Sequence, residues 1–193
     1  MTNLAEAPQS ESVASGRCEA HFEICSPWQD VPYEEQLTRK QQHLVDLYAE
    51  VEDGLPELPP IVDDFRASPV RIGYRTKMEF SFTNGDLRDE PVQLAFHKRG
   101  RRYDMEPLPE GCGLAGDATN TVALEVVERL RAAGVSARQL KSVVIREAKR
   151  TGEIVAALYV RSEDFPPDML ANLPGVCGSV VVYSRPNTPA SVV

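Results

Sequence analysis

Four cysteines are the residues of this 193-residue chain that could bind a metal or act as nucleophiles: Cys18, Cys25, Cys112 and Cys177. In a reducing compartment, paired cysteines point to metal binding or catalysis more often than to disulfides. Thiolates suit zinc and iron–sulfur cores because sulfur is a soft ligand. Free cysteine is also among the most buried residue types, so four unrelated buried thiols are the alternative. Composition alone leaves both interpretations open.

Cations make a second candidate site, although the net charge of the chain is -8. Residues 1–65 hold fourteen acidic and three basic side chains, whereas the rest of the chain holds fifteen acidic and eighteen basic ones. Exposed charges more than about 10 Å apart are largely screened at 0.1 M salt, so a local positive face can still bind phosphate. The candidate RNA-contacting residues are the cations Arg75, Lys77, Lys98, Arg99, Arg101 and Arg102, with Tyr74 and His97 to stack on bases.

The same cations have a plainer interpretation. They would form a solvated basic rim if nearby acids, namely Asp86, Asp89 and Glu90, balance their charge. Strand pairing would place Arg75 and Lys77 on a polar face, opposite Met78 and Phe80. The residue types by themselves favour the solvated rim over RNA contact.

The pattern along the chain predicts the elements that position these residues. Residues 1–17 lack periodicity and predict a disordered tail, and residues 18–65 form a cysteine-bearing segment, a helix and a linker. Asp30 is the expected cap of that helix, with Pro32 in its first turn and Gly54 at its end. Its apolar stripe consists of Leu37, Leu44, Leu47, Tyr48 and Val51.

Residues 66–193 predict an α+β domain with a mainly antiparallel sheet and helices packed on one face. Apolar residues alternate from Arg75 to Phe82, Asn84-Gly85 signals a turn, and 92–97 is the returning strand before a basic loop at 98–102. Asp117 or Thr119 would cap a second helix that ends before Gly134. A second hairpin at 140–145 and 154–160, a short helix at 166–173 and a strand at 178–183 complete the prediction.

Five stretches together resemble one family. The segment 18–25, followed by Trp28-Gln29 and by 32–37, is similar to the iron–sulfur segment of bacterial RNA uracil-5-methyltransferases. Ser68-Pro69, 74–80 and 96–100 resemble the next signatures of that family, and Pro107-Leu108 leading to Cys112 resembles the site of its last cluster cysteine. The resemblance keeps this order from about Cys18 to Thr188.

The resemblance implies a domain order: often an RNA-binding barrel, then this central domain, then a Rossmann-like domain that binds S-adenosylmethionine. We therefore expect the substrate-recognition portion of such an enzyme, with structured RNA, ribosomal more than transfer RNA, as its partner. The family's catalytic cysteine and base would lie beyond this portion, so no catalytic residue is expected here, and Cys177 is expected to be a core or strand-end thiol. S-adenosylmethionine is expected only for a full-length protein. A stand-alone RNA-binding or metal-binding module, serving a separate catalytic chain, is the alternative.

Family members with a [4Fe-4S] cluster use a Cys-x5-Cys-x2-Cys run and one distant cysteine. Here six residues separate Cys18 from Cys25, and Ser26-Pro27 stands where the third cysteine is expected. The resemblance thus implies three metal ligands, Cys18, Cys25 and Cys112. The fourth ligand would be His21, Ser26 or a small molecule, and zinc or no metal are the alternatives. With no apolar run near the roughly 18 residues of a membrane span and no signal peptide, the expected location is cytoplasmic.

Overall fold

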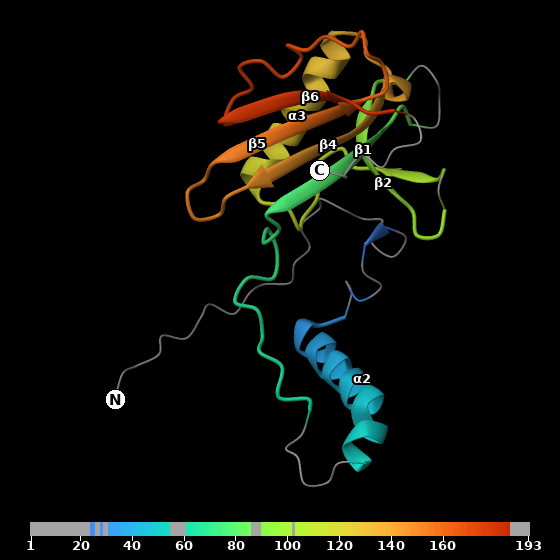
Figure 1. Ribbon diagram of the computed structural model, residues 1–193, viewed down its shortest axis with the longest axis vertical. Coiled ribbons are helices and arrows are strands. Elements are labelled where there is room, and N and C mark those ends of the chain that lie inside the picture. The colour runs from blue at the N-terminus through green and yellow to red at the C-terminus, as the bar shows by residue number, and fades with distance from the viewer. Residues whose placement is uncertain are drawn as a thin grey trace.

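The computed structural model describes residues 24, 25, 28, 31–54, 61–85, 90–101 and 103–185. Its main body is a six-stranded sheet with the strand order β3-β2-β1-β4-β5-β6 (Figure 1). Every adjacent pair is antiparallel except β5–β6, which is parallel. The strands are β1 Lys77–Thr83, β2 Gln93–His97, β3 Met105–Pro107, β4 Leu140–Glu147, β5 Ile154–Val160 and β6 Gly178–Tyr183. The predicted α+β class with a mainly antiparallel sheet is confirmed.

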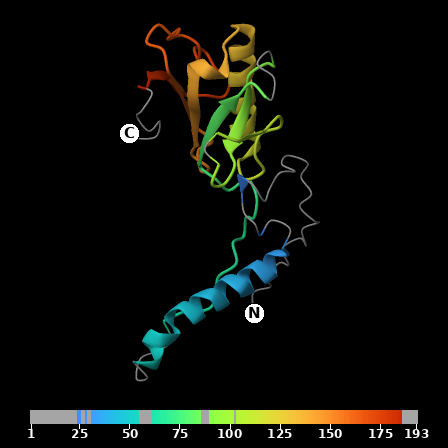
Figure 2. The ribbon, with the colours of Figure 1, turned by 90° about the vertical axis from the view of Figure 1, so that its right-hand side faces the viewer.

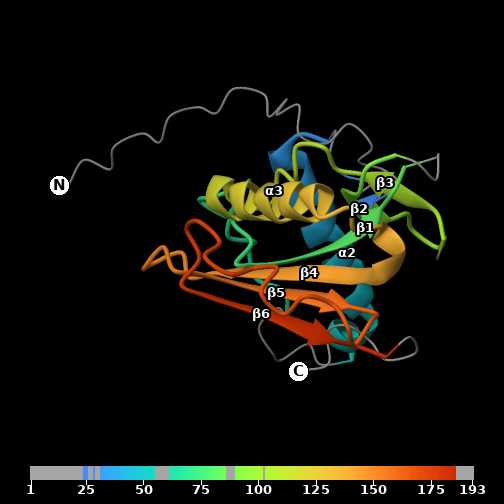
Figure 3. The ribbon, with the colours of Figure 1, turned by 90° about the horizontal axis from the view of Figure 1, so that it is seen from above.

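One helix, α3 (Asp117–Ala132), covers one face of this sheet (Figure 3). Its apolar side is fully buried and includes Val122, Val126 and Leu130. Alternate residues of β1, namely Met78, Phe80 and Phe82, point toward α3 and belong to the same core. Burying each such large side chain contributes about 1.5–3 kcal/mol, so this layer holds the body of the molecule together.

The predicted hairpins are present. The Asn84-Gly85 turn is held from a distance, because the Asn84 amide oxygen accepts a hydrogen bond from the Ala137 N–H at 2.8 Å. Ala137 belongs to η1, a short 3-10 helix (Ala137–Gln139) that the sequence did not predict. β3 was also missed, since three residues are too few to display a period.

Two local predictions were wrong. Gly116 is the N-cap of α3, without a side-chain capping bond, in place of Asp117 or Thr119. Thr119 instead donates to the Glu147 carboxylate at 2.6 Å, which ties the start of α3 to β4. The stretch 166–173 forms successive turns and no helix, and the buried Leu170 and Leu173 anchor it to the core.

The helix α2 (Tyr33–Asp53) projects away from the sheet (Figures 1 and 2). Pro32 is its N-cap, so the proline precedes the first turn, and the expected cap Asp30 lies outside the described residues. Gly54 ends it as predicted. None of its residues is buried. No described helix combines the length and apolarity that a membrane crossing requires.

Candidate functional site

A buried asparagine positions the loop that carries Cys112. The Asn120 amide oxygen accepts the Cys112 N–H at 2.9 Å, and its NH₂ group donates to the Cys112 carbonyl at 3.0 Å. Gly111 precedes this clamp with φ at 86°, and a Cβ at that position would stand 2.3 Å from the amide oxygen. Only glycine fits both the backbone and the space here, so Gly111 and Asn120 together place Cys112.

The structure brings Cys25 and Cys112 together. The pKa of Cys112 is lowered from 9.0 to about 6, mainly by a side-chain hydrogen bond from Cys25 and against the opposing effect of burial. Backbone hydrogen bonds from Leu114 and Ala115 and the positive charge of Arg75 contribute smaller parts of this lowering. Both cysteines are free thiols. Because the thiolate is the form that binds metals, this pair is prepared for a cation near neutral pH.

Cys25 reaches this position through two long-range contacts. Ile24 packs against the hydrophobic core, and the Arg99 guanidinium donates a hydrogen bond to the Cys25 carbonyl. Arg99, which the sequence suggested as an RNA contact, therefore lies against the cysteine-bearing segment. Cys18, together with His21 and Ser26, lies outside the described residues. Within the described part of the chain, no group of three or more His, Cys, Asp or Glu side chains could hold a metal.

Cys177 stands apart from this pair. It is exposed immediately before β6, and its thiol donates to the Ile154 carbonyl at 3.2 Å. It is thus a strand-end thiol, one of the two environments that its sequence context indicated.

The loop between β2 and β3 carries cations that already have acidic partners. The Lys98 ammonium lies 3.3 Å from Glu106 and 3.9 Å from Asp104, and Arg101 pairs with Asp104 at 3.1 Å. The sequence had assigned this balance to Asp86, Asp89 and Glu90, of which the structure describes only Glu90. Arg102 lies outside the described residues, and His97 is exposed at the end of β2.

A second group of cations lies where β1 begins and β4 ends. Lys77 and Arg146 are register partners on the open face of the sheet, Arg75 precedes β1, and Arg150 lies in the β4–β5 turn. We call Arg75, Lys77, Arg146 and Arg150 the basic end. In the described chain Arg75, Arg146 and Arg150 form no ion pair with an acidic side chain, and Lys77 lies 3.8 Å from Glu79.

Tyr74 stands beside this basic end with 49% of its side chain exposed, so it is not a core residue. Sequence reasoning missed Arg146 and Arg150. Arg146 was missed because it follows the buried run Val143, Val144 and Ile145, which shows no polar face in the sequence. Arg150 was read only as part of a hairpin turn.

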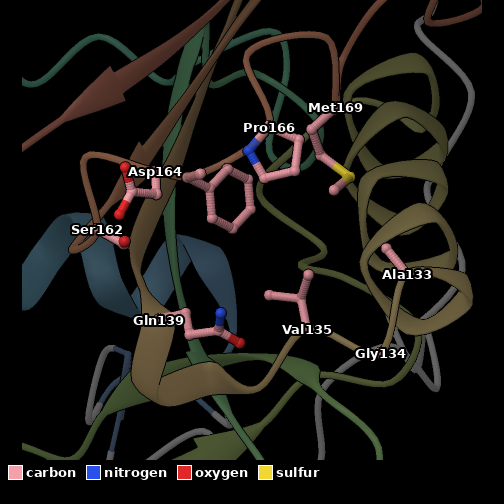
Figure 4. Close-up of a pocket in the computed structure, with 9 residues that line it drawn as sticks. Ala133, Gly134, Val135, Gln139, Ser162, Asp164, Pro166 and Met169 are labelled. Carbon is pink, nitrogen blue, oxygen red and sulfur yellow. The ribbon is translucent and has the colours of Figure 1, made fainter.

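A small cavity lies at the opposite end of α3 (Figure 4). It measures about 190 Å³ and is lined by Val135, Phe165 and Met169, with polar groups from Gln139, Ser162 and Asp164. Pockets for drug-sized ligands start at about 300 Å³, so this cavity is small for a cofactor. It shares no residue with the basic end or the thiol pair.

Comparison with known proteins places these features in a family. A comparison with family sequence profiles finds no match. An uncharacterized RNA methyltransferase of Clostridium tetani is 31% identical over 150 residues, which are 72% of this chain and 31% of that protein. A Thermotoga maritima relative of the same description is 32% identical over 148 residues, 72% of this chain and 30% of its own. The chain thus spans about a third of the length of these curated relatives.

A solved structure shares the fold. The Pyrococcus abyssi tRNA (uracil-54, C5)-methyltransferase, solved with S-adenosyl-L-homocysteine, superposes with a TM-score of 0.60 at 16% sequence identity. The match covers 84% of this chain and 38% of that chain.

Proposed function

This chain belongs to the RNA methyltransferase family of its curated relatives, and from this premise we propose that it is the portion of a uracil-5-methyltransferase that recognises the substrate RNA. The observation that carries the proposal is the basic end, whose arginines lack acidic partners in the described chain and stand beside the exposed Tyr74. Phosphate oxygens would meet these cations, and an unpaired base would stack on the Tyr74 ring.

The ion pairs rank the candidate cations. Lys98 and Arg101 must give up contacts with Asp104 or Glu106 before they can bind phosphate, so each contributes less net affinity. Arg146 and Arg150 carry no such cost. We therefore place the main phosphate contacts at the basic end, with the β2–β3 loop and His97 at its margin. The favoured partner is structured RNA with an unpaired uridine, and ribosomal RNA is the first class to test.

S-adenosylmethionine, the methyl donor of this family, does not fit the described residues. Such a site needs a strand followed by a Gly-rich turn and a helix. The one parallel strand pair here, β5–β6, is joined by turns and no helix, and the 190 Å³ cavity is too small. We assign no methyl-transfer step to the residues described here, and propose that the donor binds a region of the family enzyme that this portion does not include.

The thiol pair supports a second role as a metal site. We propose that Cys25 and Cys112 ligate a [4Fe-4S] cluster or zinc together with Cys18, because two thiolates with one pKa near 6 form an incomplete but suitable donor set. Metal analysis after anaerobic reconstitution tests this role. Cys25→Ser and Cys112→Ser should each lower the bound metal, whereas Cys177→Ser should leave it unchanged. Equal metal content in all three variants would reject the site.

The salt dependence of RNA binding tests the main proposal. For single strands the logarithm of the affinity falls with the logarithm of salt by about 0.7 per phosphate contact. The double variant Arg146→Ala/Arg150→Ala should therefore lower this slope by about 1.4. The matched control Arg101→Ala/Arg138→Ala removes the same net charge elsewhere and should change the slope much less. Equal effects in both doubles would mean that RNA responds only to overall charge. Fragments of ribosomal and transfer RNA, each with an unpaired uridine, compare the two substrate classes.

A further inference from the structure

The cavity at the end of α3 has an apolar side and a polar side. It measures about 190 Å³, and we call it the end pocket. In Figure 4 the side chains of Val135 and Met169 lie on one side of it, and those of Gln139, Ser162 and Asp164 lie on the other. Small-molecule sites usually combine apolar walls with a few polar groups that orient the ligand. The lining therefore has the character of a binding site for a small ligand.

The walls of the end pocket are held by the fold. Gly134 ends α3 with a φ of 66°, and the Val135 N–H donates at 2.9 Å to a carbonyl in the last turn of α3, which turns Val135 back against the core. Another wall residue, Phe165, is only 6% exposed and belongs to the core cluster. The Gln139 amide oxygen accepts the Ser136 N–H at 3.0 Å. Because these contacts fix the walls, binding costs little ordering of side chains.

The charge of the end pocket selects the class of ligand. Asp164 is the one charged residue among the lining residues, all of which lie in the described part of the chain. Neither Asp164 nor Ser162 forms a hydrogen bond or an ion pair with another described residue. The last carbonyls of α3 add partial negative charge where the helix ends at Gly134. A cation is therefore the complementary ligand.

The cations near the end pocket in the chain leave this negative charge uncompensated. Arg129 and Arg131, in the last turn of α3, pair with glutamates of the same helix at 3.1 and 2.6 Å. The Arg161 guanidinium donates to the Leu140 carbonyl at 2.8 Å. Arg138 is exposed and does not line the pocket. The end pocket thus offers negative charge beside apolar surface.

We propose that the end pocket binds a small aliphatic amine in its ammonium form. The ammonium group pairs with the Asp164 carboxylate and donates a second hydrogen bond to the Ser162 hydroxyl, because a primary ammonium ion has several donors to share. The alkyl chain lies against Val135, Phe165 and Met169. Asp164 repels anions, and pockets for drug-sized ligands start at about 300 Å³, so phosphate-bearing cofactors are excluded. The inference is independent of the proposed function, because the end pocket shares no residue with the basic end.

Amide NMR of the whole chain, titrated with n-butylammonium chloride at constant ionic strength, tests this site. Saturating shifts should centre on Gly134, Val135 and Phe165, with a dissociation constant on the order of millimolar for a ligand of about five non-hydrogen atoms. Asp164→Asn keeps the shape of the side chain and should weaken binding at least about fivefold. The matched control Asp168→Asn removes the same charge outside the pocket lining and should change the affinity by less than about twofold.

Two further ligands complete the test. The alcohol n-butanol has the same alkyl chain without the charge and should bind at least about fivefold more weakly. N-acetyl-lysine methylamide carries the ammonium chain on a peptide backbone and should bind no tighter than n-butylammonium. Shifts that do not saturate, equal losses in both variants, or equal affinity for the alcohol would overturn the proposal. A lysine derivative that binds more than about tenfold tighter would also overturn the free amine as ligand, and would assign the end pocket to a lysine of a partner protein.

Discussion

Replacing Asn120 with alanine tests how the molecule holds Cys112. Asn120 is 4% exposed on the buried side of α3, and its amide satisfies both the N–H and the carbonyl of Cys112. In Asn120→Ala the buried Cys112 N–H loses its partner, whereas the Cys112 carbonyl keeps its hydrogen bond from the Ala115 N–H at 3.0 Å. The loop would then lose its attachment to α3, and Cys112 its fixed position beside Cys25.

The expected cost follows mainly from the Cys112 N–H. A buried polar group left without a hydrogen bond costs about 1–3 kcal/mol, so Asn120→Ala should lower the free energy of unfolding by about 1–3 kcal/mol. Each kcal/mol shifts the midpoint of thermal unfolding by about 2–8 °C for domains of this size range. The loss should therefore be visible in both urea and thermal unfolding.

Urea unfolding followed by circular dichroism measures this cost against two further variants. Thr121→Ala, the next residue of the same helix, removes only a hydroxyl that bonds to Asp117 within the helix, and should cost less than about 0.5 kcal/mol. Asn120→Asp keeps the acceptor for the Cys112 N–H but sets a carboxylate against the Cys112 carbonyl, so it should also be strongly destabilising at neutral pH. If Asn120→Ala costs no more than Thr121→Ala, the amide does not hold the loop.

Three further variants test neighbouring parts of the same argument. Gly111→Ala should destabilise the domain by at least about 1 kcal/mol, because its φ is 86° and its Cβ would stand 2.3 Å from Asn120; unchanged unfolding would contradict this. Folding lowers the pKa of Cys112 from 9.0 to about 6, so its contribution is fully present above pH 9 and lost as pH falls through 6. Cys25→Ala removes the main cause of this lowered pKa. The free energy of unfolding that this variant loses, measured on metal-free, reduced protein, should therefore grow by up to about 1 kcal/mol per pH unit from pH 6 to pH 9. A loss that does not change with pH would reject the thiol hydrogen bond. Phe80→Ala should cost about 3–5 kcal/mol in urea, since Phe80 is fully buried and stacks on Phe96 at 5.5 Å, and a cost below about 1 kcal/mol would refute its place in the core.

Periodicity explains why the sheet could be predicted from the sequence. The alternation Met78, Phe80, Phe82 has the period of a strand with one buried face, and the same alternation settles the side on which Lys77 lies. β6 matches its predicted bounds because its centre is the β-branched run Val180 to Val182, which Tyr183 follows. The turns at 166–173 were missed because the apolar residues there have helical spacing, whereas Leu170 and Leu173 are buried in the core without forming a helix.

The site depended on contacts that no local pattern records. The resemblance indicated which cysteines matter, yet the hydrogen bond between Cys25 and Cys112 joins residues that lie far apart in the chain. The density of positive charge indicated the loop from Lys98 to Arg102 as a phosphate-binding site. In the structure, however, Lys98 and Arg101 already form ion pairs with Glu106 and Asp104. Arg146 joined the candidate residues only through its register with Lys77 across two strands.

The sequence by itself determined five of the six described strands, the α+β class and the family signatures, because these depend on side-chain spacing within a few residues. Only the tertiary structure decided which thiols meet, which cations stay without an acidic partner in the described chain, and that the stripe on α2 faces away from the core. Hydrogen bonds and ion pairs act over a few ångströms in space, and residues at that distance are set by how the strands pair and pack. A stripe such as Leu47 and Val51 is the same in sequence whether the sheet or another surface covers it.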